Sequence, residues 1–284
     1  MPEQNVLVGT SGYDFRWWKY DPATEVGVYH AVRKNWFFEY CHLGLKSLEI
    51  NATFYRRQKK AFYDKLNRMA EISGVRYTVK LNKYGSHAKK LLNPEDWCAE
   101  AFAEYLQLGA NLDCVLVQLN GDFKRFGKDG RDRLERLKNL AEHVPEGMRL
   151  AFEFRSQDWY CEDVYAVLRA NNWCLCIVHL ANHKRVKHQV VRDGEGPVAV
   201  PQKKNWGGDL SDGWSPRVFT ADFAYFRLHG PRGQYVGEYG ERFCREIEGF
   251  VRAAGRRNSF VMFNNTDDGC SAVWDALAMQ QLFE

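Results

Sequence analysis

The chain has 284 residues, a formal net charge of +4, 45% hydrophobic residues and 27% charged residues. This composition is typical of a globular protein with a sizeable core and excludes a largely disordered chain. The positive charge is too small to indicate a nucleic-acid-binding protein by itself. The first residues show no signal-peptide pattern, and no apolar run approaches the ~18 residues of a membrane helix. We therefore expect a cytoplasmic protein with no membrane partner.

Short β-branched or aromatic runs alternate along the chain with stretches whose apolar residues recur at helical spacing, as at Phe102, Tyr105 and Leu106. Alternation of this kind predicts parallel strands joined by helical crossovers. The eight runs, in chain order, are Val6–Thr10, Ser47–Asn51, Arg76–Lys80, Cys114–Gln118, Leu150–Phe154, Cys174–Val178, Ala224–Leu228 and Ser259–Phe263. They predict an α/β fold, a TIM-type (β/α)8 barrel forming one domain over residues 1–284. An open doubly wound sheet is the alternative, which the lack of a G-x-G-x-x-G motif after the first run disfavours.

A long polar insertion, residues 181–221, separates the sixth and seventh predicted strands. It contains the basic residues Lys184, Arg185 and Lys187. A connection of this length is usually functional or mobile. Two interpretations are open: a solvated excursion that replaces a helix, or a basic segment that contacts single-stranded nucleic acid.

Polar side chains occupy alternate positions at the C-terminal ends of the predicted strands. Because successive side chains of a strand face opposite sides, the apolar set must face the helices and the polar set the barrel lumen. Barrel enzymes build their sites at these strand ends. The predicted lumen set is Glu49, Asn51, Lys80, Gln118, Glu153, Arg155, Arg227, His229 and Asn264.

The lumen set has more fixed positive than negative charge. The cations Lys80, Arg155 and Arg227 outnumber the two carboxylates, Glu49 and Glu153. An anionic ligand such as a phosphate or carboxylate would balance the excess, and arginine grips such groups with two hydrogen bonds. The alternative is a closed structural network in which these residues neutralise each other. On the ligand interpretation, we expect Arg227→Ala to abolish binding at little cost in stability.

Aromatic residues follow several of the predicted strands, among them Tyr13, Tyr55, Trp159 and Tyr235. Aromatic side chains beside cations suit a ligand with a ring, which stacks on their faces. Alternatively, each of them caps the barrel mouth as part of a small core.

Seven motifs occur in an order that resembles the domain of unknown function 72 family, which includes the YecE-like proteins. They are Gly9–Tyr13, Leu48–Arg56, Val79–Lys80, Gln118–Leu119, Glu153–Arg155 with Trp159, Arg227–Gly230 with Tyr235, and Phe263–Thr266. The resemblance covers nearly the whole chain and implies a TIM-type barrel, but it implies no reaction. Asp158 and Asp275 depart from the family pattern, and we expect them to add negative charge near the barrel mouth.

The leading functional hypothesis is an enzyme, a hydrolase or lyase, acting on an anionic, phosphate-bearing or nucleotide-like substrate. Glu49 or Glu153 would be the general base and His229 the general acid. The ligand-binding candidates are Ser11, Tyr13, Asn51, Tyr55, Lys80, Gln118, Arg155, Trp159, Arg227, Tyr235, Asn264 and Asn265. No cofactor motif stands out, and Glu49, Glu153 and His229 are the weak candidates for binding one divalent metal ion.

Two other hypotheses use the same residues. The pocket and the basic insertion would bind nucleic acid or a nucleotide without catalysis, with a steep dependence on salt. Alternatively, Glu49 and Glu153 would act as the acid and base of a sugar isomerase or epimerase. The sequence does not indicate an oligomeric state.

Overall fold

The computed structural model describes residues 4–30, 35–127, 129–181, 213–267 and 269–284. Within these ranges, nine parallel strands form one sheet in the order β6-β5-β4-β3-β2-β1-β9-β8-β7. The strands are β1 (Asn5–Ser11), β2 (Ser47–Ile50), β3 (Arg76–Lys80), β4 (Leu112–Gln118), β5 (Leu150–Glu153), β6 (Cys174–Leu175), β7 (Ile177–His179), β8 (Phe223–Leu228) and β9 (Asn258–Phe263).

The two edges of this sheet belong to the same stretch of chain. The sequence predicts one strand over Cys174–Val178, whereas the structure divides this stretch into β6 and β7 at Cys176. The first half pairs with β5, and the second half pairs with β8. A staggered barrel requires such a change of partner, because neighbouring strands are offset along one another. The sheet therefore comes close to closing on itself, and the predicted TIM-type barrel is confirmed.

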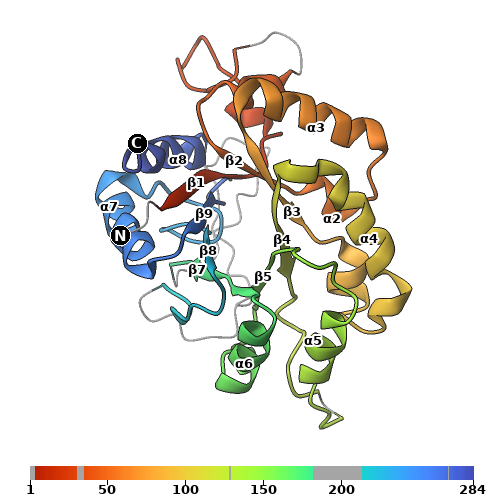
Figure 1. Cartoon of the computed structure of the whole chain (residues 1–284). Helices are drawn as coiled ribbons and strands as arrows, with labels where there is room; N and C mark the ends of the chain where they lie inside the picture. Colours follow the sequence, from red (N-terminus) through yellow and green to blue (C-terminus); the bar gives the residue numbers. More distant parts are fainter. Residues whose placement is uncertain (1–3, 31–34, 128, 182–212, 268) are drawn as a thin grey trace, which may run out of the picture.

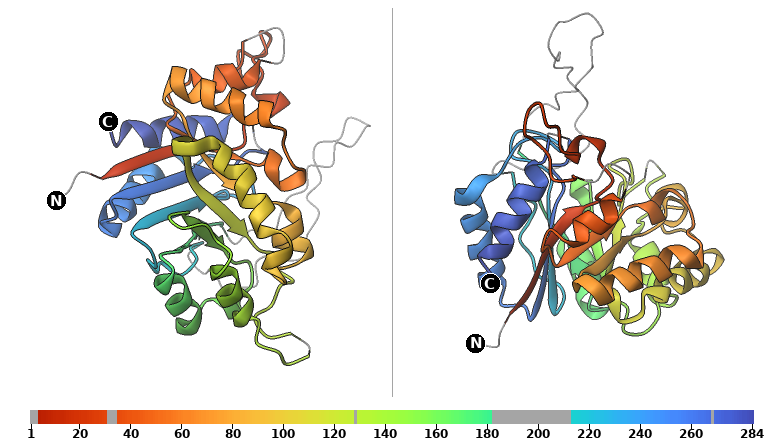
Figure 2. Two further views of the ribbon diagram at one scale, coloured as in Figure 1. Left: turned by 45° about the vertical axis from the view of Figure 1, so that its right-hand side comes forward. Right: turned by 90° about the horizontal axis from the view of Figure 1, so that it is seen from above.

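The helices lie on the outside of the strands (Figures 1 and 2). In α3, for example, the buried residues Tyr63, Leu66 and Ala70 recur at three and four positions and so form one apolar face. The helices of the described chain are α1 (Trp36–Cys41), α2 (Ala52–Tyr55), α3 (Lys60–Ser73), α4 (Cys98–Tyr105), α5 (Leu134–Ala141), α6 (Glu162–Ala170), α7 (Gly240–Ala254) and α8 (Ser271–Gln281). None of these described helices is long and apolar enough to cross a bilayer.

Each strand separates two layers of side chains. On β2, Leu48 and Ile50 belong to the larger apolar cluster, which contains residues of the helices. Lumen residues such as Leu7, Cys114 and Phe260 form a second, smaller cluster. Polar residues share the lumen with this second cluster, as predicted from the alternation along the strands. These polar residues build the site described below.

Most of the predicted insertion, residues 182–212, lies outside the described residues. Lys184, Arg185 and Lys187 are all in this part. The last part of the insertion is described and runs beside β7. The Leu180 amide donates to the Gly213 carbonyl at 2.8 Å, and the Ser215 amide donates to the Val178 carbonyl at 2.9 Å. This segment therefore extends the backbone pairing at the β7 edge.

Candidate functional site

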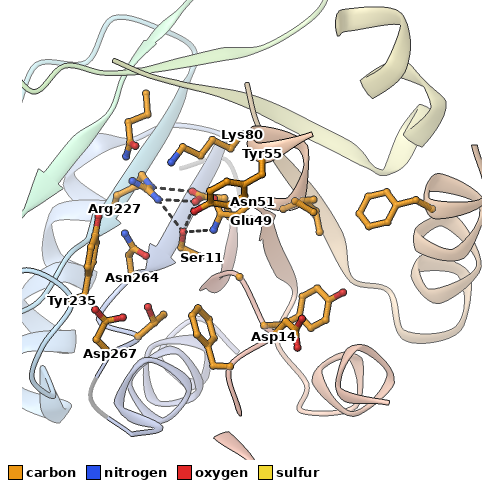
Figure 3. A pocket seen from close by; sticks show the side chains of 18 residues that line it. Ser11, Asp14, Glu49, Asn51, Tyr55, Lys80, Arg227, Tyr235, Asn264 and Asp267 are labelled. Carbon is orange, nitrogen blue, oxygen red and sulfur yellow. Dashed lines mark hydrogen bonds and ion pairs between the residues drawn. The ribbon is translucent and has the colours of Figure 1, made fainter. Parts of the chain in front are cut away.

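A cavity of about 470 Å³ opens at the C-terminal ends of the strands (Figure 3). It is lined by many of the residues predicted from the sequence, namely Ser11, Tyr13, Glu49, Asn51, Tyr55, Lys80, Gln118, Arg227, Tyr235 and Asn264. Asp14, Phe62, Thr266 and Asp267 also line the cavity and were not among the site candidates from the sequence. These four lie in loops or on a helix, where the alternation of strand side chains gives no signal.

Arg227 forms the centre of the site. Its Nε donates to Glu49 Oε2 at 2.9 Å, and its Nη2 donates to Glu49 Oε1 at 2.7 Å. Its Nη1 makes an ion pair with Glu153, and its Nη2 also donates to Ser11 Oγ at 2.9 Å. The side chain is 1% exposed, and both carboxylates are 0% exposed. One arginine from β8 thus bridges acids from β2 and β5 inside the lumen.

Further hydrogen bonds reach the carboxylate oxygens of Glu49 and Glu153. Tyr225 Oη donates to Glu49 Oε2 at 2.8 Å. Glu153 Oε1 accepts from Gln118 Nε2 at 2.8 Å and from Arg155 Nε at 3.1 Å. This geometry matches the closed-network alternative for the buried acids. It also contradicts the expectation that Arg227 contributes little to stability, because removing it leaves two buried carboxylates without their main counter-charge.

The network lowers the pKa values of both acids. Burial by itself would raise the pKa of Glu49 and Glu153, but the charge of Arg227 and the other nearby charges and hydrogen bonds together outweigh burial and leave both pKa values below the usual range. A carboxylate with a lowered pKa and occupied oxygens is a weak base. The arrangement therefore does not suit the general-base role expected for either glutamate.

His229 is neutral in this environment. Burial lowers its pKa to about 4, despite the neighbouring Glu153 carboxylate. Its Nδ1 lies 2.9 Å from Asn264 Nδ2, which acts as the donor, and its Nε2 lies 3.6 Å from Glu153 Oε1. With Asn264 as the donor to Nδ1, the neutral imidazole carries its proton on Nε2, which lies between Glu153 Oε1 and Arg227 Nη1, the latter at 3.4 Å. This environment does not suit the general-acid role predicted for His229. With a pKa of about 4, only a small fraction of His229 is in the protonated imidazolium form at neutral pH.

Of the three predicted lumen cations, Lys80 has no carboxylate partner among the described residues. Its Nζ lies 4.2 Å from the centre of the Phe54 ring, and no hydrogen bond or ion pair reaches it from the described residues. Figure 3 shows it beside the linked group of Ser11, Glu49 and Arg227, with no interaction drawn to it. Burial and the charges of Arg227 and Arg155 lower its pKa to about 7. Lys80 therefore exists in both protonation states near neutral pH.

Tyr235 lines the pocket from a strained loop. Its φ of 70° lies in the left-handed region that large side chains rarely adopt. Both backbone groups are held, since its amide donates to the His229 carbonyl and its carbonyl accepts from the Asp267 amide at 2.9 Å. Gly230, at the start of the loop, has a φ of 131°, and a Cβ there would lie 2.2 Å from the Gly233 carbonyl oxygen. The loop is thus fixed in a costly conformation, as often occurs at functional sites.

Aromatic residues form another part of the pocket wall. Tyr13, Phe15, Phe62 and Tyr55 all line the cavity. Tyr55 is 76% exposed and lines the same cavity as the polar group (Figure 3). An exposed ring at a pocket mouth offers a face for stacking.

The structure does not bring Trp159 into the pocket. Its side chain is fully buried, stacks on Phe154 with 5.1 Å between ring centroids, and donates its Nε1 hydrogen to the Phe123 carbonyl at 2.8 Å. It belongs to the core between the strands and the helices. For Trp159, the alternative of a small core at the barrel mouth describes the packing better than a stacking role.

Asn265 and the two unusual aspartates also lie away from the cavity lining. Asn265 Nδ2 donates to Asp275 Oδ2 at 2.7 Å, and the Tyr239 amide donates to the same oxygen at 2.9 Å. Asp158 accepts a hydrogen bond from the Arg125 amide at 2.7 Å. The expected negative charge at the mouth therefore comes from Asp14 and Asp267 instead of Asp158 and Asp275.

The donor set for a metal ion is poor. Among the described residues, no group of three or more His, Cys, Asp and Glu side chains is arranged to hold a metal ion. Glu49 and Glu153 lie near His229, but the Arg227 guanidinium is bonded to both of them. A cation bonded to both acids leaves a divalent ion without free carboxylate oxygens. The weak metal candidates therefore do not form a fitting site.

A model of a protein family of unknown function, DUF72, matches residues 7–284. The chain belongs to the DUF72 family. This agrees with the resemblance found in its motifs, from Gly9–Tyr13 to Phe263–Thr266. A search of curated proteins finds no match.

Solved structures of DUF72 proteins have the same fold. A family member from Thermotoga maritima is 23% identical, with a TM-score of 0.71 over 98% of this chain and 99% of that one. A member from Enterococcus faecalis is 16% identical, with a TM-score of 0.68 over 98% of this chain and 95% of that one. A D-psicose 3-epimerase is 13% identical, with a TM-score of 0.54 over 97% of both chains. At these identities the comparisons establish a shared barrel fold and no shared reaction.

Proposed function

We propose that this DUF72 protein is an enzyme, a hydrolase or lyase, that acts on a small anionic molecule bound in the pocket at the barrel mouth. One observation carries the proposal. The lumen acids are neutralised by Arg227 and Arg155, and Lys80 is left as a pocket-lining cation without an acidic partner in the part of the chain that the structure describes. A phosphate or carboxylate group of the substrate would supply the missing negative charge.

The charge balance links anion binding to proton uptake. With Lys80 neutral, the charges of Arg227 and Arg155 balance those of Glu49 and Glu153, so these lumen side chains carry no net charge. Because the pKa of Lys80 is about 7, its amino group loses a proton as the pH rises through neutrality when no anion is bound. An anion beside the amino group would favour the charged form, and the site would take the proton back.

The position of the pocket and its strained wall support an enzyme over a simple binding surface. Barrel enzymes place their reacting groups at the C-terminal strand ends, where Lys80 and Asn51 lie. The left-handed Tyr235 is a costly feature in the same cavity wall. The alternative of a sugar isomerase with Glu49 and Glu153 as acid and base gains no support, since Arg227 occupies both carboxylates.

The proposal is tested by calorimetric titration with sulfate, which resembles phosphate but does not itself titrate near neutral pH. In two buffers of different ionisation enthalpy, the wild-type protein should take up roughly 0.7 proton per sulfate at about pH 7.5. Lys80→Arg should bind sulfate without proton uptake, because arginine stays charged. Lys80→Met should bind at least about tenfold more weakly.

Lys89→Met is the matched control, because Lys89 is paired with Asp96 at 3.2 Å and does not line this pocket. It should behave like the wild type. If wild-type protein binds no sulfate, or binds it equally well without Lys80, the proposed anion site is wrong.

A further inference from the structure

Lys80 has a second property that anion binding alone does not use. Its amino group reaches the cavity from the end of β3, partly buried and without a hydrogen-bond acceptor among the described residues. It contacts the face of the Phe54 ring in a cation–π arrangement, with 4.2 Å between Nζ and the ring centre. An ion-paired lysine is held protonated, whereas this environment leaves a large share of Lys80 as the free amine. A free amine in a pocket is a nucleophile.

Burial and the neighbouring arginines explain why the amine is available. Burial lowers the pKa of Lys80 most, and the fixed charges of Arg227 and Arg155 lower it further to about 7. Both arginines are themselves anchored to carboxylates, Arg227 to Glu49 and Glu153 and Arg155 to Glu153. They stay in place when Lys80 changes its charge. The two guanidinium groups thus remain as fixed positive charges beside the amino group.

We infer that Lys80 is a catalytic nucleophile that forms an imine with the carbonyl carbon of an anionic substrate, so that the substrate class is a 2-oxo acid or a phosphorylated aldehyde or ketone. This inference rests on the proposed function, because it assigns a covalent step to the same anion site. It favours the lyase over the hydrolase within that proposal.

The step is balanced in atoms and charge. The Nζ lone pair forms a bond to the carbonyl carbon, the C=O π electrons move to oxygen, and a proton passes from nitrogen to that oxygen. Loss of water from this carbinolamine gives the imine, which takes one proton to become the iminium ion. The iminium restores the single positive charge of protonated Lys80, and the phosphate or carboxylate of the bound molecule neutralises it. Hydrolysis reverses the step and frees the amine.

Other parts of the cavity suit such a substrate. Asn51 and Asn264 line the cavity and carry amide groups that can hydrogen-bond the oxygens of a carbonyl compound. The volume of about 470 Å³ leaves ample room for a molecule of three or four carbon atoms. Small probes are therefore suitable for the test.

The test is reductive trapping with cyanoborohydride, using pyruvate and glycolaldehyde phosphate as probes and acetone as the uncharged comparison. Peptide mass mapping identifies the modified lysines. Because its pKa is about 7 and that of an exposed lysine is about 10.5, Lys80 should react on the order of a hundredfold faster near neutral pH. The two anionic probes should react faster than acetone, and sulfate should slow them.

Two variants separate this inference from the proposed function. Lys80→Arg keeps the charge but has no nucleophilic amine, so it should bind sulfate and give no adduct at position 80. Lys89→Arg should be trapped like the wild type. If the wild type binds sulfate with proton uptake yet neither anionic probe modifies Lys80 faster than exposed lysines, the imine step is wrong and the anion site stands. If sulfate does not bind either, both proposals fail.

Discussion

Removing Arg227 should destabilise the protein strongly near neutral pH. In Arg227→Met, the apolar side chain retains much of the volume but leaves Glu49 and Glu153 buried without their shared counter-charge. Breaking a buried ion pair from one side costs ~3–5 kcal/mol, and here one side chain serves two acids. We therefore expect the free energy of unfolding to fall by at least about 3 kcal/mol, and some of the variant protein to be unfolded at neutral pH.

The pH dependence identifies the cause. The folded-state pKa values of both glutamates lie below the ordinary 4.5, so their contribution to stability is present above that pH and is lost as the pH falls through the folded values. The unpaired glutamates of Arg227→Met take up protons at a higher pH than those of the wild type, so the deficit should be largest near neutral pH and shrink as the pH falls toward the wild-type folded values below 4.5. Urea unfolding from about pH 3 to pH 7 measures it.

Two controls accompany this measurement. Arg252→Met removes an exposed arginine paired with Glu248 on α7 and should cost less than about 1 kcal/mol. The triple variant Glu49→Gln, Glu153→Gln, Arg227→Met carries no charge at these positions and should recover much of the lost stability. A deficit below about 1 kcal/mol for Arg227→Met, or one that does not change with pH, would refute the buried-network reasoning.

Three further variants probe the pocket and its surroundings. Tyr55→Ala should weaken binding of phenyl phosphate relative to sulfate by about fivefold or more in titrations, since base–aromatic stacking is worth ~1–3 kcal/mol and ~1.4 kcal/mol is tenfold. Tyr84→Ala, at an exposed ring outside this cavity, should weaken neither. Gly230→Ala should displace the loop that carries Tyr235 and lower sulfate affinity in the same assay; unchanged affinity would contradict the role of the loop. Burial raises the pKa of Asp275 to about 6, so its contribution to stability is full below 3.8 and is lost as the pH rises through 6. Relative to Asp275→Asn, the wild-type free energy of unfolding should therefore fall by on the order of 3 kcal/mol over that interval in urea titrations, and a difference independent of pH would contradict it.

The barrel, and the side of the sheet that each strand residue faces, can be predicted from the sequence because both follow from repeating patterns. Strands alternate with helices along the chain, and side chains alternate in direction along each strand. Leu48 and Ile50 alternate with Glu49, and a side chain next to an apolar neighbour on the same strand must face the other side. The family resemblance gave the same fold independently. The strand break at Cys176 was not predictable, because it depends on the stagger between neighbouring strands and not on local residue type.

The pairing of the lumen charges could not be predicted from a count. The count correctly gives one cation more than acids, but only the barrel geometry brings β8 opposite both β2 and β5, so that Arg227 reaches two acids and Lys80 reaches none of them. The same limit applies to Trp159, because the sequence does not show whether the side chain of a loop tryptophan points into a cavity or into the core, where Trp159 lies. Asp14 and Asp267 were missed because loop side chains have no period.

The pKa of Lys80 is the most direct test of the account. NMR titration of isotope-labelled lysine side chains, with Lys80→Arg to assign the signal, measures it with and without sulfate. We predict a pKa of about 7 for the free protein, against 10.5 for an ordinary lysine, and a marked rise when sulfate is bound. A Lys80 pKa near 10.5 that sulfate does not change would contradict both the surplus charge and the anion site.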